Sequence, residues 1–128
     1  MIGSRPKKNK GEASKASVRA SGVSSSGEQA ENVLLGFNAN AYVLQLMAAG
    51  AEKPLMDYID EQSNKKNLRL YRGVRNGRSW YIIVEGYYVD RNDALAGISK
   101  LPNAQRANRP WPKKVASVQQ EIKAYLAK

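Results

Sequence analysis

Apolar and polar residues alternate along several short stretches of the chain, as they do in strands. Residues 41–47, "AYVLQLM", have a period of two, so the two faces of the predicted strand carry different side chains. One face carries Tyr42, Leu44 and Leu46. The other face carries Val43, Gln45 and Met47. Because an amide without partners is costly in a core, Gln45 should face away from the covering helices.

The remaining stretches complete an ordered set of elements. Helices are predicted over 30–37, 52–66, 90–102 and 117–128, and strands over 67–74, 78–87 and 111–118. Pro54 suits a first helical turn, Asp90 an N-cap, and Ser117 with Gln120 a capping box. The order predicts an α+β fold, the split β-α-β-β-α-β arrangement. It has a four-stranded antiparallel sheet, two helices on one face and an added C-terminal helix.

The stretch "RNGRSWYIIVEGYY" predicts a tight hairpin and an unusual second strand. Asn76 and Gly77 both tolerate the positive φ of a type I′ turn. The strand after the turn is apolar at five consecutive positions, so neither of its faces is predicted to be polar. If this strand neighbours residues 41–47, Trp80, Ile82 and Val84 share the face of Gln45. Tyr81 and Ile83 then lie under the helices.

Two positions for Trp80 remain open at this stage. Its ring lies exposed on the helix-free face of the sheet, or it belongs to the core and packs under the terminal helix. That helix presents an apolar stripe of its own, made of Val118, Ile122, Tyr125 and Leu126. Periodicity does not decide whether this stripe covers the face that carries Trp80.

Charge and composition narrow the range of functions. The chain of 128 residues has 21 Lys and Arg against 11 Asp and Glu, a net charge of +10 that favours acidic partners. It has no His and no Cys, which removes the commonest general base, thiol nucleophile and zinc ligands. We therefore expect neither an enzyme nor a bound cofactor or metal. No apolar run approaches the length of a transmembrane helix.

The first part of the chain differs from the rest in composition. Residues 1–30 are rich in Ser, Gly, Lys and Ala and include six basic and two acidic residues, which is +4 of the net charge. Such a segment buries too little apolar surface to offset its ordering entropy. We predict that residues 1–30 are a disordered basic linker and that residues 31–128 form one domain, whose charge is +6.

Four segments in this order resemble a SPOR domain. They are "YVLQL", "RNGRSWYIIVEGYY", "DRNDALAGISKLP" and "ANRPWPKKVASVQQEI", and together they span about residues 40–123. The resemblance implies a periplasmic peptidoglycan-binding module that recognises glycan strands stripped of their stem peptides, which are enriched at the division septum. It also implies anchoring to the inner membrane through a segment outside this chain, with other cell-division proteins as further candidate partners.

The same resemblance implies a glycan site on the helix-free face of the sheet. It assigns Gln45, Trp80 and Trp111 to this site, and Ala48 more weakly, because members tend to carry hydroxyl residues just after "LQL". Here that stretch is Met47-Ala48-Ala49-Gly50, so backbone groups would supply its polar contacts. Arg75, Arg78, Lys113 and Lys114 would form a basic rim for the lactyl carboxylates of a denuded strand.

The basic residues and Trp111 also have a plainer interpretation. The four basic side chains are equally typical of a solvated surface, and Trp111 could fix its loop by packing between Pro110 and Pro112. Two other functions fit a basic sheet with aromatic residues: RNA binding and recruitment of proteins. Against RNA, the strand "RSWYIIVEGYY" lacks the aromatic-Gly-aromatic spacing of RNA-recognition domains, so we expect no nucleic acid partner.

Overall fold

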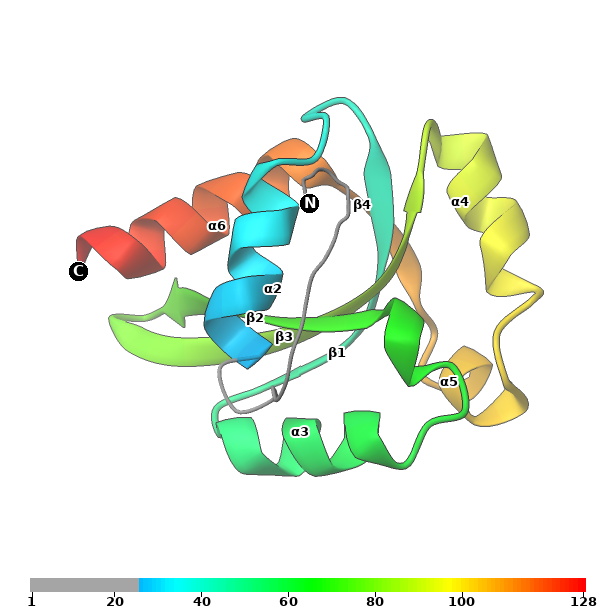
Figure 1. Cartoon of the computed structure of the whole chain (residues 1–128), viewed down its shortest axis with the longest axis horizontal. Helices are drawn as coiled ribbons and strands as arrows, with labels where there is room; N and C mark the ends of the chain where they lie inside the picture. Colours follow the sequence, from blue (N-terminus) through cyan, green and yellow to red (C-terminus); the bar gives the residue numbers. More distant parts are fainter. Residues whose placement is uncertain (1–25) are drawn as a thin grey trace, which may run out of the picture.

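A computed structural model describes residues 26–128, and the sheet at its centre has four antiparallel strands (Figure 1). The strands are β1 (Tyr42–Ala49), β2 (Leu68–Arg75), β3 (Arg78–Tyr88) and β4 (Trp111–Lys114), in the spatial order β2-β3-β1-β4. β1 and β3 are neighbours, which is the condition under which Trp80 shares the face of Gln45. The predicted fold class and four-stranded antiparallel sheet are confirmed.

Within residues 26–128, five α-helices and a short 3₁₀ helix surround the sheet. They are α2 (Ser26–Leu35), α3 (Glu52–Asp60), η1 (Lys65–Asn67), α4 (Arg91–Ile98), α5 (Asn103–Ala107) and α6 (Val115–Ala127). The helix predicted over 52–66 ends at Asp60. The amides of Gln62 and Asn64 that follow it hydrogen-bond to the buried Gln105 of α5, a helix that the sequence did not predict.

The predicted linker lies mostly outside the described residues. Its last five residues, 26–30, form the first half of α2, so this helix starts before the predicted boundary of the domain. The predicted helical turn over 30–37 is confirmed as the second half of α2. Of its apolar residues Leu34 is buried and Leu35 half-buried, whereas Val33 is exposed.

The hairpin between β2 and β3 has the predicted geometry. Asn76 and Gly77 have φ values of 54° and 78°, and the flanking Arg75 and Arg78 face each other across the turn. Both positive φ values match a type I′ turn, whose twist suits the two strands. The Asn-Gly pair therefore fixes the register of β3, and with it the position of Trp80 in the sheet.

β1 contains a bulge that the alternation did not reveal. Gln45 lies opposite Val84 and Met47 lies opposite Ile83, so two residues of β1 take the place of one on β3. Leu46 and Met47 consequently contact the same core, next to α3 and α4. The prediction that Met47 shares the face of Gln45 is therefore wrong.

The sheet separates two hydrophobic cores. One core lies under α3 and α4, and its buried residues are Leu44, Leu46, Leu55, Leu68, Leu70, Ile83, Ala94 and Leu101. The second core lies between the opposite face and the pair α2 and α6, and its buried residues are Leu34, Ala41, Val43, Tyr71, Ile82, Val84, Val115, Val118 and Ile122. Figure 1 shows α2 and α6 together on one side of the sheet.

The face of the sheet opposite α3 and α4 was predicted to be free of helices. Trp80, Ile82 and Val84 do lie on the face opposite α3 and α4, but Ile82 and Val84 are buried there. Trp80 is half-buried and packs against the same core. α2 and α6 therefore cover part of this face, so the expectation that it is free of helices is wrong. The part of the face between Trp80 and Trp111 remains accessible.

α6 starts directly after β4 without the predicted capping box. Its first helical residue is Val115, so Ser117 lies inside the helix, and no side chain caps the N-terminus. The backbone N–H groups of Val115 and Ala116 instead donate to the carbonyls of Ala41 and Ala39, at 2.9 and 3.0 Å. These carbonyls accept hydrogen bonds from N–H groups that would otherwise need a capping side chain.

Two polar contacts hold α2 in place. The carboxylate of Glu31, which is only 2% exposed, accepts hydrogen bonds of 2.8 Å from the backbone N, Nε and a terminal nitrogen of Arg72 on β2. Gln119 of α6 donates through Nε2 to the carbonyl oxygens of Leu34, Leu35 and Phe37 at the C-terminal end of α2. α2 is thus joined to both the sheet and α6.

We expect Glu31→Ala to lower the free energy of unfolding by about 3 kcal/mol, because Arg72 would lose the partner of a largely buried pair. Thermal or urea unfolding measures this change. Lys53→Ala, which breaks the exposed pair with Asp57, is the control and should have little effect. Equal effects of the two substitutions would contradict the role assigned to Glu31.

Candidate functional site

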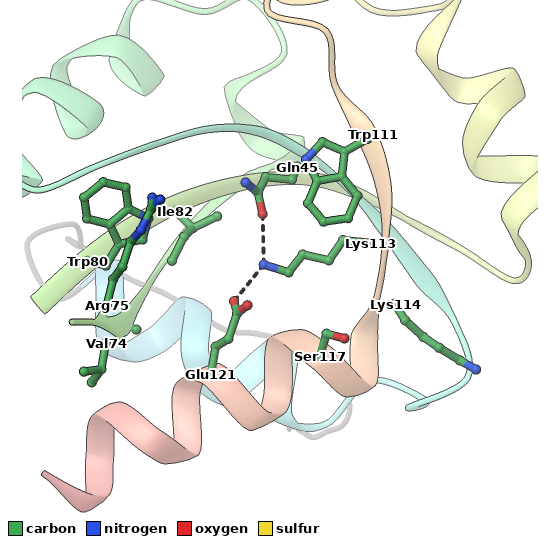
Figure 2. Close-up of a pocket in the computed structure, with 11 residues that line it drawn as sticks. Gln45, Val74, Arg75, Trp80, Ile82, Trp111, Lys113, Lys114, Ser117 and Glu121 are labelled. Carbon is green, nitrogen blue, oxygen red and sulfur yellow. Dashed lines mark hydrogen bonds and ion pairs between the residues drawn. The ribbon is translucent and has the colours of Figure 1, made fainter. Parts of the chain in front are cut away.

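A groove of about 430 Å³ lies between α6 and the uncovered end of the sheet (Figure 2). All four strands contribute to it. Its lining residues are Gln45 of β1, Gly73, Val74 and Arg75 of β2, Trp80 and Ile82 of β3, Trp111, Lys113 and Lys114 of β4, and Ser117 and Glu121 of α6. We call this feature the α6 groove. α6 forms one wall of the groove, and the sheet, which carries both tryptophans, forms the other.

The two tryptophans differ in how much of each ring is accessible. Trp111 is 48% exposed, so its ring offers a flat surface to a ligand. Trp80 is half-buried, and the guanidinium carbon of Arg75 lies 4.7 Å from the centre of its ring. Trp111 therefore does not serve as a buried anchor for its loop, while part of Trp80 is already occupied by Arg75.

Strand pairing brings the polar residue of the predicted site next to Trp111. Gln45 and Trp111 face each other in the register of β1 and β4, and both project on the groove side of the sheet. Lys113, two residues after Trp111, projects on the same side because side chains alternate along a strand. The sheet thus brings together predicted residues from two segments that are distant in the sequence.

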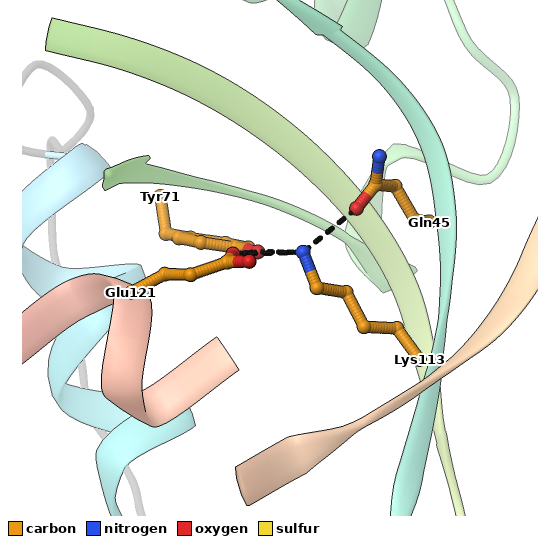
Figure 3. Close-up of polar contacts among 4 residues, drawn as sticks. All are labelled: Gln45, Tyr71, Lys113 and Glu121. Atoms are coloured by element: carbon orange, nitrogen blue, oxygen red, sulfur yellow. Dashed lines mark hydrogen bonds and ion pairs between the residues drawn. The ribbon is translucent and has the colours of Figure 1, made fainter. Parts of the chain in front are cut away.

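Lys113 is a buried ammonium with three partners (Figure 3). It is 7% exposed, and its Nζ donates to Gln45 Oε1 at 2.9 Å, to the Tyr71 hydroxyl at 2.9 Å and to Glu121 Oε1 at 2.7 Å. Tyr71 in turn donates to the same Glu121 oxygen. These contacts join β4, β1, β2 and α6 through one side chain.

Tyr71 keeps its proton in this cluster. Burial raises the pKa of its hydroxyl, and the hydrogen bond to Glu121 raises that pKa further. The hydroxyl can therefore donate to Glu121 and accept from Lys113 at the same time. Glu121 supplies the negative charge that balances the buried ammonium.

The predicted site residues fall into three groups. Six of them line the α6 groove: Gln45, Arg75, Trp80, Trp111, Lys113 and Lys114. Arg78 instead lines a second, more open hollow next to the hairpin, which it shares with Trp80 and Arg75. Ala48 is half-buried and packs against the core under α2 and α6, outside the residues that line either hollow.

Lys113 was expected on an exposed basic rim, and that expectation is wrong. Because side chains alternate along a strand, Lys113 points into the groove under α6, whereas Lys114 lines the groove as an exposed side chain. Ser117 and Glu121 of the groove wall were not predicted as site residues. Their spacing of four places them on one face of α6, which was the available signal.

The strands that form the groove match a known protein family. The model of the SPOR domain family matches residues 38–114, which include β1 to β4 and most of the groove. The chain belongs to the SPOR domain family. SPOR domains are peptidoglycan-binding modules related to cell division.

A curated relative supports the assignment. The chain is 33% identical over 104 residues to the cell division protein DamX of Serratia marcescens, a match that covers 81% of this chain and 46% of that protein. The chain thus spans about half the length of its relative. Within residues 26–128 no helix is long and apolar enough to cross a membrane.

The difference in exposure gives different expectations for the two tryptophans. Trp80→Ala should lower the free energy of unfolding by ~2 kcal/mol, because Trp80 packs against the core, whereas Trp111→Ala should lower it by less than ~1 kcal/mol. Chemical denaturation of the two variants measures both values. The reverse order would contradict the burial described above.

The ion pair between Lys113 and Glu121 should be detectable in a double-mutant cycle. We expect a coupling energy of about 1–2 kcal/mol from the unfolding of Lys113→Met, Glu121→Gln and the double variant, since each single change leaves a partner uncompensated. Half-exposure of Glu121 keeps the value moderate. Additive effects of the two single changes would show that the pair is not coupled.

Proposed function

We propose that this domain binds glycan strands of peptidoglycan that have lost their stem peptides, and that it does so in the α6 groove. The observation that carries the proposal is the exposed ring of Trp111 beside Gln45, in a groove that Trp80 lines at its other end (Figure 2). Such binding would direct the protein to the division septum in the periplasm, where denuded strands are enriched. The proposed role is one of binding and not of catalysis.

The chemistry of the groove suits a sugar polymer. Pyranose rings have patches of C–H groups that stack on aromatic faces, and the exposed ring of Trp111 offers such a face. Sugar hydroxyls and N-acetyl groups form hydrogen bonds with amides, and Gln45 supplies one directly opposite Trp111. An aromatic platform beside an amide can therefore hold one sugar residue by its ring and by its substituents.

The charge of the groove suits a denuded strand in particular. The lining contains three cations, Arg75, Lys113 and Lys114, and one carboxylate, Glu121, so the groove has an excess of two positive charges. Arg78 adds a further cation in the neighbouring hollow. Removal of a stem peptide frees the lactyl carboxylate of each muramic acid. A denuded strand therefore carries carboxylates directly on its sugar residues, and the positive groove would attract them.

The coverage of the sheet favours a glycan over RNA. RNA-recognition domains stack bases on exposed aromatic rings of the two central strands. Here the central strands are β1 and β3, and their residues Val43, Ile82 and Val84 are buried under α2 and α6. The accessible surface is a groove at one end of the sheet, which fits an extended polymer better than an array of stacked bases.

The proposal is tested by co-sedimentation with purified, protein-free sacculi before and after amidase treatment. We expect amidase treatment to increase binding, and Trp111→Ala to weaken it roughly tenfold, the size expected when a stacking face is lost. Tyr87→Ala is a matched control, because Tyr87 is a similarly exposed aromatic residue near the opposite end of β3.

Two results would contradict the proposal. One is equal binding to treated and untreated sacculi, which would remove the preference for denuded strands. The other is equal loss of binding in Trp111→Ala and Tyr87→Ala, which would place the ligand outside the α6 groove. Displacement of the protein from treated sacculi by RNA at physiological salt would favour the nucleic acid alternative.

A further inference from the structure

The Gln45 amide has a fixed orientation in the α6 groove. Its Oε1 lies 2.9 Å from Lys113 Nζ. A lysine ammonium can only donate hydrogen bonds, so the amide oxygen must face it and the amide nitrogen must face away. Figures 2 and 3 show the Gln45 nitrogen pointing away from Lys113. Gln45 therefore presents N–H donors to the groove, while its oxygen is held toward Lys113.

Lys113 has no hydrogen left for a ligand. An ammonium has three N–H groups, and here the three acceptors are Gln45 Oε1, the Tyr71 hydroxyl and Glu121 Oε1, at 2.9, 2.9 and 2.7 Å. It is also 7% exposed. The side chain thus lines the groove, but its hydrogen bonds are all directed to protein atoms.

The neighbouring polar groups of the groove are also donors. The indole nitrogens of Trp80 and Trp111 can only donate, and the Arg75 guanidinium carries N–H groups and no acceptor. The sheet side of the groove consequently offers donors from Gln45, both tryptophans and Arg75. A ligand that forms hydrogen bonds there must supply acceptors.

We propose that Lys113 is a positioning residue, which orients Gln45 so that the groove selects a ligand with a carbonyl or carboxylate oxygen at this position. The inference rests on the proposed function. A denuded glycan strand has two such groups, the lactyl carboxylate and the carbonyl of the N-acetyl group. Lys113 contributes to recognition through Gln45, and Glu121 and Tyr71 hold Lys113 in place.

Two substitutions of Gln45 test the direction of the hydrogen bond. Gln45→Glu keeps the shape and the acceptor for Lys113 but presents an oxygen to the groove, whereas Gln45→Met removes both polar atoms. We expect Gln45→Glu to bind denuded glycan at least about tenfold more weakly than Gln45→Met. The glutamate would place a carboxylate oxygen against the acceptor oxygen of the ligand. Equal or tighter binding by Gln45→Glu would overturn the inference.

The two sources of the acceptor are separated by amidating the lactyl carboxylates of the glycan. If the carboxylate is the partner, the penalty of Gln45→Glu relative to Gln45→Met should disappear with the amidated ligand. If the N-acetyl carbonyl is the partner, the penalty should remain. Failure of the unaltered protein to bind denuded glycan would instead overturn the proposed function, and the ligand assignment with it.

The role of Lys113 is tested without ligand, through the side-chain NH₂ signals of Gln45 in ¹⁵N-correlated NMR spectra. The variant Lys113→Met with Glu121→Gln removes both charges together, so no carboxylate is left unpaired. We expect these signals to move and to exchange faster than in the unaltered protein. Signals that stay in place would show that Lys113 does not orient the amide. Lys114→Met, which alters the exposed neighbour, is the control.

Discussion

The buried ammonium of Lys113 is the interaction on which the shape of the groove depends. It connects the edge strand β4 to β1 through Gln45, to β2 through Tyr71 and to α6 through Glu121. Burying a charge is costly unless it is paired and fully hydrogen-bonded, and this arrangement meets both conditions. The same contacts fix the distance between α6 and the sheet near Trp111, and they set the direction of the Gln45 amide.

The position of α6 converts a flat sheet face into a groove. α2 and α6 bury one end of the face together, held by the pair of Glu31 and Arg72 and by the bonds of Gln119 to the end of α2. The other end stays accessible between α6 and the hairpin. A ligand therefore meets the exposed ring of Trp111 and an already stacked pair of Arg75 and Trp80. Trp111 is the more accessible of the two aromatic platforms.

Local signals in the sequence predicted the parts of this structure that local chemistry determines. The Asn76-Gly77 turn and the cap of Asp90, whose Oδ1 accepts from the N–H of Asp93, are examples. The polarity of Gln45 correctly placed it on the face of Trp80. Met47 was misplaced because a bulge has no signature in alternation. The burial of Lys113 depends on Glu121 and Tyr71, which are distant in sequence, and on where α6 docks, which its apolar stripe does not specify.

The central claim is that a denuded glycan lies in the α6 groove against Trp111 and Gln45. Titration of ¹⁵N-labelled protein with short denuded glycan fragments tests this most directly. We expect the largest shifts at the indole N–H groups of Trp111 and Trp80 and at the side-chain NH₂ of Gln45. Shifts confined to α3 and α4, on the opposite face of the sheet, would contradict it.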